Sequence, residues 1–285
     1  MAPHLAVFDS GVGGLSIVQS LDRQLGNYQL SYLFDNALFP YGELGESTLV
    51  ARVLNLVVPF CQTQRPDLLV IACNTASTVV LKPLRQMLSI PVVGVVPAIK
   101  PACEISQSKI IGLLATPATI GRSYTKQLIE RFSNHCTVLK IGSTELVEIA
   151  EQKLSAQTPD LEHLRSIVSA WLKAKVQPDV VVLGCTHFPL LRNELGAIFG
   201  KNTRLVDSGQ AVAKRVATLL DIKQAAHQQN CLRVGYYTKK NAHTNSLWAS
   251  FNALGFNELN LLLENDLCVR SPDGLLVSDA ETLVH

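Results

Sequence analysis

An internal repeat constrains the fold of this chain more than any other feature. Residues 66–75 read PDLLVIACNT, and residues 178–187 read PDVVVLGCTH. Each copy has Pro-Asp, then a continuous apolar run, then a cysteine at the same position. Self-similarity of this kind indicates a duplicated structural unit, and runs that are apolar throughout are typical of strands buried on both faces of a parallel sheet. The repeat therefore predicts two similar halves, in which corresponding strands end at Cys73 and Cys185.

Weaker echoes extend the repeat on both sides. The matching segments are 5–10 with 111–116, 31–36 with 138–143, and 91–94 with 204–207. Between the strands, apolar residues recur at helical spacing, as Leu15, Val18 and Leu21 do. Alternating strands and helices predict parallel sheets with right-handed crossovers. We therefore expect an α/β fold with two similar parallel-sheet domains, four strands in the same order in each, and a further strand at 232–237 that joins one of the sheets.

Composition narrows the class of protein. Of 285 residues, 47% are apolar and 17% are charged, which favours a globular chain with a large core. Lys and Arg total 25 against 23 Asp and Glu, so we expect neither a nucleic-acid partner nor binding to a membrane surface. The longest apolar stretches, such as 90–99, fall well short of the ~20 residues that span a bilayer. Seven scattered cysteines without a Cys-x-x-Cys pair fit a reducing cytoplasm and predict no structural metal site.

Small and reactive residues gather where strands of the predicted sheets end. In open parallel sheets, ligands bind beyond the carboxyl ends of the strands. Four such ends are residues 9–14 (DSGVGG), 35–42 (ending in PYG), 73–77 (CNTAS) and 185–189 (CTHFP). A helix is expected after the first, third and fourth, and its N-terminus favours an anion or a thiolate. Ser10, Asn74, Thr75 and Thr186 suit either helix capping or a small polar ligand.

Two opposed thiols would suit one kind of reaction. If the halves face each other about a pseudo-twofold axis, Cys73 and Cys185 enter one interdomain cleft from opposite sides. One thiolate can then remove a proton from a carbon while the other thiol returns one to the opposite face. This arrangement requires a sulfur–sulfur distance of roughly 7 Å. A free thiol has a pKa of ~8.5, so each cysteine needs an assisting group. Asp9 could serve Cys73, and His187 or Glu151 could serve Cys185.

These blocks, in this order, resemble the signature segments of bacterial glutamate racemases. The resemblance rests on DSGVGG at 9–14, PYG at 40–42, ACNTAS at 72–77 and GCTHFP at 184–189. It runs from about residue 5 to about residue 213, and more faintly to residue 256. It implies interconversion of L- and D-glutamate without a cofactor, as a supply of D-glutamate for peptidoglycan.

The resemblance also implies a role for each matching residue. Cys73 would act on D-glutamate with help from Asp9, and Cys185 on L-glutamate with help from His187 and Glu151. The implied substrate-binding residues are Ser10, Tyr41, Gly42, Asn74, Thr75 and Thr186. Residues 143–150, just before Glu151, depart from the cysteine–proline stretch that is usual in the family. The implied domains are 1–97 with 210–265, and 98–209, followed by a tail at 266–285.

Two other functions stay open at this stage. The first is a related cofactor-independent racemase that acts on aspartate or another small amino acid. The second is a non-catalytic protein that binds a nucleotide or a partner, because the turn at 11–14 is rich in glycine. That turn lacks the Gly-x-x-x-x-Gly-Lys pattern, and Ser16 stands where Gly-x-Gly-x-x-Gly needs its last glycine. The chain could also act as a homodimer, since nothing in the sequence fixes the oligomeric state.

Overall fold

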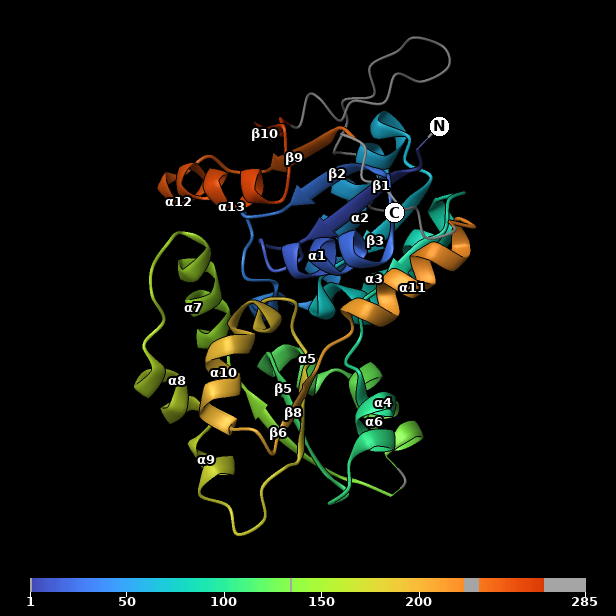
Figure 1. The fold of residues 1–285 in the computed structure, drawn as a ribbon. Coiled ribbons are helices and arrows are strands. Elements are labelled where there is room, and N and C mark those ends of the chain that lie inside the picture. Colours follow the sequence, from blue (N-terminus) through green and yellow to red (C-terminus); the bar gives the residue numbers. More distant parts are fainter. Residues whose placement is uncertain (1, 134, 223–230, 264–285) are drawn as a thin grey trace.

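A computed structural model describes residues 2–133, 135–222 and 231–263, and these form two parallel sheets with helices on their faces (Figure 1). The strands are β1 His4–Asp9, β2 Gln29–Phe34, β3 Leu68–Ile71, β4 Val92–Gly94, β5 Ile110–Ala115, β6 Thr137–Gly142, β7 Val180–Leu183, β8 Arg204–Val206, β9 Arg233–Tyr237 and β10 Glu258–Leu261. The predicted α/β class with two parallel sheets is confirmed.

The two sheets repeat one strand order. The first sheet runs β10–β9–β2–β1–β3–β4, and the second runs β6–β5–β7–β8. Every pairing in both sheets is parallel. The block β2–β1–β3–β4 therefore corresponds to β6–β5–β7–β8, with β3 and β7 in equivalent places. The prediction of four strands in the same order in each half is confirmed, and the further strand predicted at 232–237 is β9, which pairs with β2 in the first sheet.

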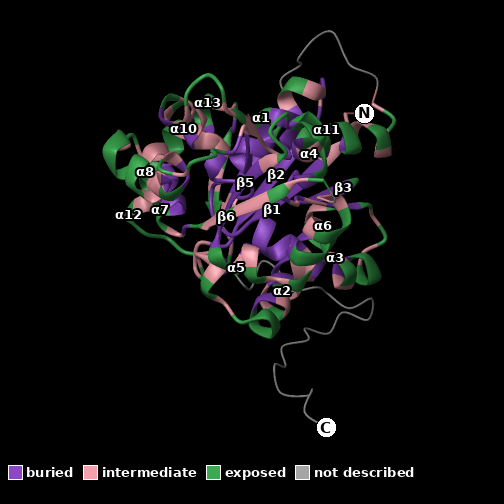
Figure 2. Ribbon diagram, turned by 90° about the horizontal axis from the view of Figure 1, so that it is seen from below, coloured by how far each residue is buried: buried purple, intermediate pink, exposed green. Residues whose placement is uncertain are grey.

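Helices cover both faces of each sheet. Their bounds are α1 Leu15–Gln24, α2 Glu46–Gln64, α3 Asn74–Met87, α4 Ile99–Ile105, α5 Pro117–Gly121, α6 Ser123–Phe132, α7 Glu145–Leu154, α8 Leu161–Ile167, α9 Ser169–Leu172, α10 Arg192–Phe199, α11 Gly209–Leu219, α12 Ala242–Ser246 and α13 Trp248–Ala253. Two 3-10 turns, η1 Tyr41–Glu43 and η2 Phe188–Leu191, interrupt the pattern. Figure 2 shows most of the strands in the buried interior, β6 as half-buried to exposed, and the outer faces of the helices as exposed.

Alternation along the strands divides each core into two layers. In β1, Leu5 and Val7 pack with α1 and α11, whereas Ala6 and Phe8 pack with α2 and α3. This follows from the strand period of two, which sends successive side chains to opposite faces. In the second sheet, one layer lies under α7–α10 and the other under α4 and α6. Because both faces are covered, the strand ends are the places where a ligand can reach the sheets.

Two details differ from the sequence-based expectations. β10 was not predicted; its residues alternate between exposed and half-buried, so it lacks the apolar run that marks the other strands. The helix predicted after Cys185 begins as the 3-10 turn η2, with Pro189 in its first turn, and continues as α10.

The domain bounds given above stay a prediction, and the tail at 266–285 lies outside the described residues. Within the described residues, no helix is long and apolar enough to cross a membrane.

Candidate active site

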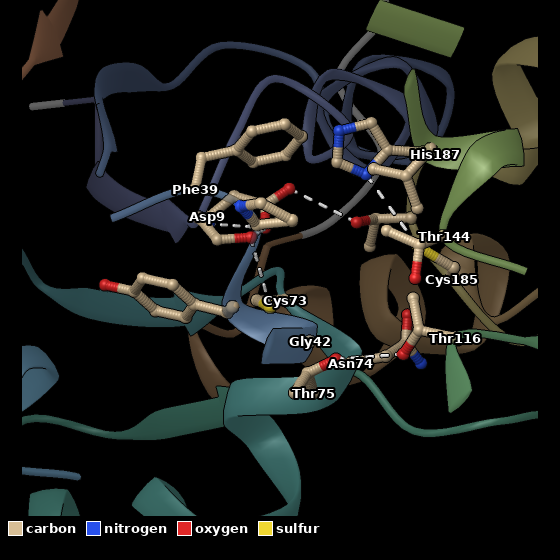
Figure 3. Close-up of a pocket in the computed structure, with 15 residues that line it drawn as sticks. Asp9, Phe39, Gly42, Cys73, Asn74, Thr75, Thr116, Thr144, Cys185 and His187 are labelled. Atoms are coloured by element: carbon tan, nitrogen blue, oxygen red, sulfur yellow. Dashed lines mark hydrogen bonds between the residues drawn. The ribbon is translucent and has the colours of Figure 1, made fainter. Parts of the chain in front are cut away.

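A pocket lies at the carboxyl ends of strands from both sheets, and both predicted thiols line it (Figure 3). Cys73 follows β3, and Cys185 follows β7 after a single glycine. Its other lining residues are Asp9, Ser10, Phe39, Pro40, Tyr41, Gly42, Asn74, Thr75, Thr116, Thr144, Val147, Thr186 and His187. The structure thus brings together all of the predicted site residues except Glu151, which lies directly behind His187.

Cys73 stands at the N-terminus of α3. It is the N-cap residue of that helix, and its Sγ accepts a hydrogen bond from the backbone N–H of Ala76 at 3.5 Å. The Ser10 hydroxyl lies 3.5 Å from the same sulfur. Burial, and then the nearby charge of Asp9, raise the pKa of the Cys73 thiol well above its usual range, and these two contacts only partly offset the effect. Negative charge at Cys185 would raise the pKa of Cys73 further.

Asp9 is fully buried and is held by several donors. Its Oδ1 accepts from the backbone N–H of Ser10 at 2.7 Å, and its Oδ2 from that of Gly14 at 2.6 Å. The Thr186 hydroxyl, from the other half of the chain, donates to Oδ2 at 3.2 Å. Burial raises the pKa of Asp9 to about 6 despite the positive charge of His187 and these donors. The link to Cys73 runs through the Ser10 hydroxyl, which is 3.4 Å from Oδ1.

Cys185 has a different set of partners. Its Sγ lies 3.7 Å from Nδ1 of His187, and Nε2 of the same ring lies 2.7 Å from Oε1 of Glu151. Cysteine, imidazole and carboxylate therefore form a line, as in sites where a third group orients a base. Figure 3 shows Cys185 beside His187, on the far side of the pocket from Cys73 and Asp9. Glu151, which follows the stretch 143–150 that departs from the family pattern, is the carboxylate next to His187.

The charges in this line follow from its geometry. Burial alone would raise the pKa of Glu151, but hydrogen bonds from His187 and His243 lower it to about 2. Burial alone would lower the pKa of His187, yet the Cys185 sulfur and the Glu151 carboxylate raise it well above its usual value. The His187 ring therefore lies between the Cys185 sulfur and the Glu151 carboxylate, and the backbone N–H of Gly13 also points at its Nε2 at 3.1 Å. A charged imidazolium at this distance stabilises negative charge on the Cys185 sulfur.

The glycine-rich turn at 11–14 serves this site and not a phosphate group. The backbone N–H of Val12 donates to Oε1 of Glu151 at 2.9 Å, and that of Gly14 donates to Asp9. The backbone N–H of Gly13, between them, points at His187 Nε2 at 3.1 Å, so these three N–H groups of the turn already have partners within the protein. A Cβ on Gly13 would come within 2.4 Å of His187 Nδ1, so only glycine allows the ring to approach this closely. This observation weakens the nucleotide-binding alternative.

A buried carboxylate fixes the segment that carries Tyr41 and Gly42. The Tyr41 hydroxyl donates to Oδ2 of Asp35 at 2.7 Å, and Arg52 binds both oxygens of the same carboxylate at 2.8 and 2.9 Å. Tyr41 is almost fully buried, whereas Gly42 reaches the pocket next to Thr116. Asp35 thus anchors the loop that brings Gly42 to the pocket.

The sequence-based reasoning did not single out Phe39, Thr116, Thr144 or Val147. Thr116 had a usable signal, because it ends the segment that echoes residues 5–10 and so corresponds to Ser10. Its Oγ1 lies 3.3 Å from the Thr75 hydroxyl, which joins the two halves at the floor of the pocket. Phe39 packs against the His187 ring at a centroid distance of 5.9 Å. No repeat or motif marks Phe39, and only the folded chain shows its contact.

Comparison with known proteins agrees with this geometry. The Asp/Glu/hydantoin racemase family model matches residues 9–216, which span every strand end that forms the pocket. The chain belongs to the Asp/Glu/hydantoin racemase family. The glutamate racemase of Photorhabdus laumondii is 48% identical over 266 residues, covering 92% of this chain and 91% of that protein. The glutamate racemase of Vibrio cholerae is 49% identical over 261 residues, covering 92% and 97%.

Solved structures in this family share the fold. Escherichia coli glutamate racemase, in complex with L-glutamate and the activator UDP-MurNAc-Ala, superposes with a TM-score of 0.86 at 44% identity. That match covers 92% of this chain and 98% of the other. The glutamate racemase of Campylobacter jejuni gives a TM-score of 0.73 at 29% identity, covering 89% and 99%. The chain is therefore similar to these racemases over nearly its whole described length.

Proposed function

We propose that this chain interconverts L- and D-glutamate by a two-thiol reaction at Cα, without a cofactor. The observation that carries the proposal is that Cys73 and Cys185, from equivalent strands of the two sheets, line one pocket. A racemase must break a C–H bond on one face of a planar intermediate and form it on the other. Two Brønsted groups on different sides of the pocket meet this requirement, whereas one group would need the substrate to turn over.

The charges around the sulfurs suit the direction from L- to D-glutamate. The imidazolium of His187 stabilises a thiolate at Cys185, which removes the α-hydrogen of L-glutamate. Cys73, whose pKa is raised, holds a proton that it delivers to the opposite face of the carbanion. For D-glutamate the roles are exchanged. Cys73 passes its proton through the Ser10 hydroxyl to Asp9 and, as a thiolate, removes the α-hydrogen, while the thiol of Cys185 protonates the opposite face of the carbanion. The assignment of each sulfur to one enantiomer follows the family pattern.

The walls of the pocket supply the remaining requirements. Asn74, Thr75 and Thr186 are buried side chains that offer hydrogen bonds to the substrate carboxylates and ammonium group. Tyr41 and Gly42 close the pocket from the loop that Asp35 holds. Exclusion of water strengthens each of these contacts and favours the developing negative charge at Cα. Ser10 serves both the substrate and the link from Asp9 to Cys73.

The decay of circular dichroism of pure L- and pure D-glutamate tests the activity. With purified chain and no added pyridoxal phosphate, both signals should decay to zero, because the two enantiomers have equal free energy. Decay with aspartate and not with glutamate would favour the related racemase instead. Stabilisation by a nucleotide, with no decay for any amino acid, would favour the non-catalytic alternative.

The cellular role that we propose is the supply of D-glutamate for peptidoglycan in the cytoplasm. Depletion of the gene product in its own host should then stop growth unless D-glutamate is added. Growth that does not depend on D-glutamate would contradict this role but not the activity. Light scattering of the purified chain, with and without glutamate, tests whether a homodimer forms.

A further inference from the structure

His243 lies on α12, beyond residues 9–216 that the family model matches, yet it contacts the site. Its Nε2 is 2.7 Å from Oε2 of Glu151. Because that carboxylate is ionised, the ring nitrogen must donate. Its other nitrogen, Nδ1, lies 3.0 Å from the hydroxyl of Ser155, at the end of α7. The ring thus has a partner at both nitrogens, while the His243 side chain remains 35% exposed.

Each oxygen of Glu151 consequently has its own donors. Oε1 accepts from His187 Nε2 at 2.7 Å and from the backbone N–H of Val12 at 2.9 Å, whereas Oε2 is held by His243. A carboxylate with donors on both oxygens cannot rotate without breaking a hydrogen bond. Glu151 therefore presents Oε1 to His187 in one orientation. Without His243, Oε2 would lose this side-chain donor, and only the two donors to Oε1 would orient the carboxylate.

We propose that His243 is a positioning residue for the Cys185 half of the reaction, a role that rests on the function proposed above. It holds Glu151, which holds His187, which faces the Cys185 sulfur. It makes no contact with the substrate-facing side of the pocket. Its effect should therefore fall on proton transfer at Cys185 and leave proton transfer at Cys73 intact.

Isotope effects separate this role from a general loss of structure. Because the equilibrium constant of a racemase is one, kcat/KM must fall equally in both directions whichever half is impaired. The deuterium isotope effect does not obey this restriction. In the direction in which Cys185 breaks the Cα–H bond, a slower Cys185 step makes bond breaking more rate-limiting, so the isotope effect rises. In the reverse direction Cys73 breaks the bond, that step limits the rate less, and the isotope effect falls.

The test compares His243→Ala, His243→Gln and wild type with α-deuterated L- and D-glutamate. For His243→Ala we expect kcat/KM about tenfold lower, the order of loss that follows removal of a hydrogen bond to a charged group. The isotope effect should rise with one enantiomer and fall with the other. His243→Gln keeps an N–H donor and should recover most of the activity. Unchanged activity in His243→Ala, or isotope effects that move alike in both directions, would overturn the proposal.

Two further variants act as controls. His163→Ala removes another histidine–glutamate pair, in which Nε2 of His163 on α8 lies 2.8 Å from Oε1 of Glu145 on α7 at the surface, and should leave activity unchanged. Ser155→Ala removes the partner of His243 Nδ1 and should give a smaller change of the same sign as His243→Ala. If both controls behaved like His243→Ala, the effect would come from docking of α7 and the proposal would fail.

A second readout does not need turnover. In nuclear magnetic resonance spectra, the Nε2–H proton of His187 should be shifted downfield by its short hydrogen bond to Glu151. We expect that signal to move or to exchange faster in His243→Ala, and to stay in place in His163→Ala. An unchanged signal in His243→Ala would overturn the positioning role. If the wild-type chain racemised no glutamate, the proposed function would fail, while this signal would still test the geometry.

Discussion

The surroundings of Cys73 and Cys185 differ although the two residues occupy equivalent places in the repeat. Cys73 lies over a buried carboxylate, Asp9, with the Ser10 hydroxyl between them. Cys185 lies beside an imidazolium that a second carboxylate supports. One sulfur thus faces negative charge and the other faces positive charge. The duplicated fold supplies two matching positions, and residues that are not duplicated give the two sulfurs different surroundings.

The largest effect should come from removing either sulfur. Cys73→Ser and Cys185→Ser should each lower racemisation by about 10²–10⁴-fold, the usual contribution of a positioned acid or base. The measurement is the circular dichroism decay of both enantiomers. Cys103→Ser, at a thiol outside the pocket, is the control and should keep full activity. Full activity in either of the first two variants would end the two-thiol account.

The next effect concerns the carboxylate on the Cys73 side. Asp9→Asn should lower kcat/KM by about 10²-fold, at the low end for an assisting group. In wild type, Asp9 takes up a proton as the pH falls through about 6, because its pKa is raised to that value. Activity should therefore fall on the acidic side of about pH 6 and be retained above it. A pH profile of kcat/KM measures this, and Asp9→Asn should lack that acidic limb. An identical limb in the variant would assign it to another group.

A backbone change tests the Cys185 side in a comparable way. Gly13→Ala places a Cβ within 2.7 Å of three ring atoms of His187, so the ring must move away from Cys185. Displacement of about an ångström costs up to about 10²-fold in rate, and we expect a loss of that order with the fold intact. Gly196→Ala on α10 is the control, since a Cβ there meets nothing within 4 Å. Equal activity in the two variants would show that the close approach of the turn to His187 is not needed.

The smallest effect should come from the loop over Cys73. Tyr41→Phe removes the hydroxyl that donates to Asp35 and leaves that buried carboxylate with one donor fewer. The free energy of unfolding should fall by about 1.5–3 kcal/mol, the usual contribution of a hydrogen bond to a charged group, since Arg52 still binds the carboxylate. Denaturant titration measures this loss. Tyr236→Phe is the control, because its hydroxyl makes only a 3.4 Å contact with Gln64. Racemisation should change less in Tyr41→Phe than in Gly13→Ala.

Most of the architecture could be predicted from the sequence because the repeat and the apolar runs are local signals. The eight strands of the duplicated block, and β9, were found in this way. β10 was missed because its four residues have no apolar run, and it depends on pairing with β9. Thr116 could have been found by extending the repeat to the residue that corresponds to Ser10.

The parts of the site that escaped prediction depend on contacts between distant segments. Phe39 meets His187, and His243 meets Glu151, across stretches of chain that carry no shared motif. Residue type does not identify these two as site residues, because a single phenylalanine or histidine outside any motif is common in proteins. The charge difference between the two sulfurs is equally invisible, because it arises from burial of Asp9 and from the order of donors on Glu151. The predicted sulfur–sulfur distance and the domain bounds stay predictions.

Deuterium labelling at Cα tests most directly whether two different groups flank one carbon. The reaction is run in D₂O from pure L-glutamate and stopped at low conversion. The two enantiomers are then separated, and the deuterium content of each is measured by mass spectrometry. The account predicts deuterium in the D-glutamate formed and protium in the L-glutamate that remains. The same result is expected in mirror image from D-glutamate. Deuterium in the remaining substrate at the same rate as in the product, or product that retains protium, would mean that a single base serves both faces.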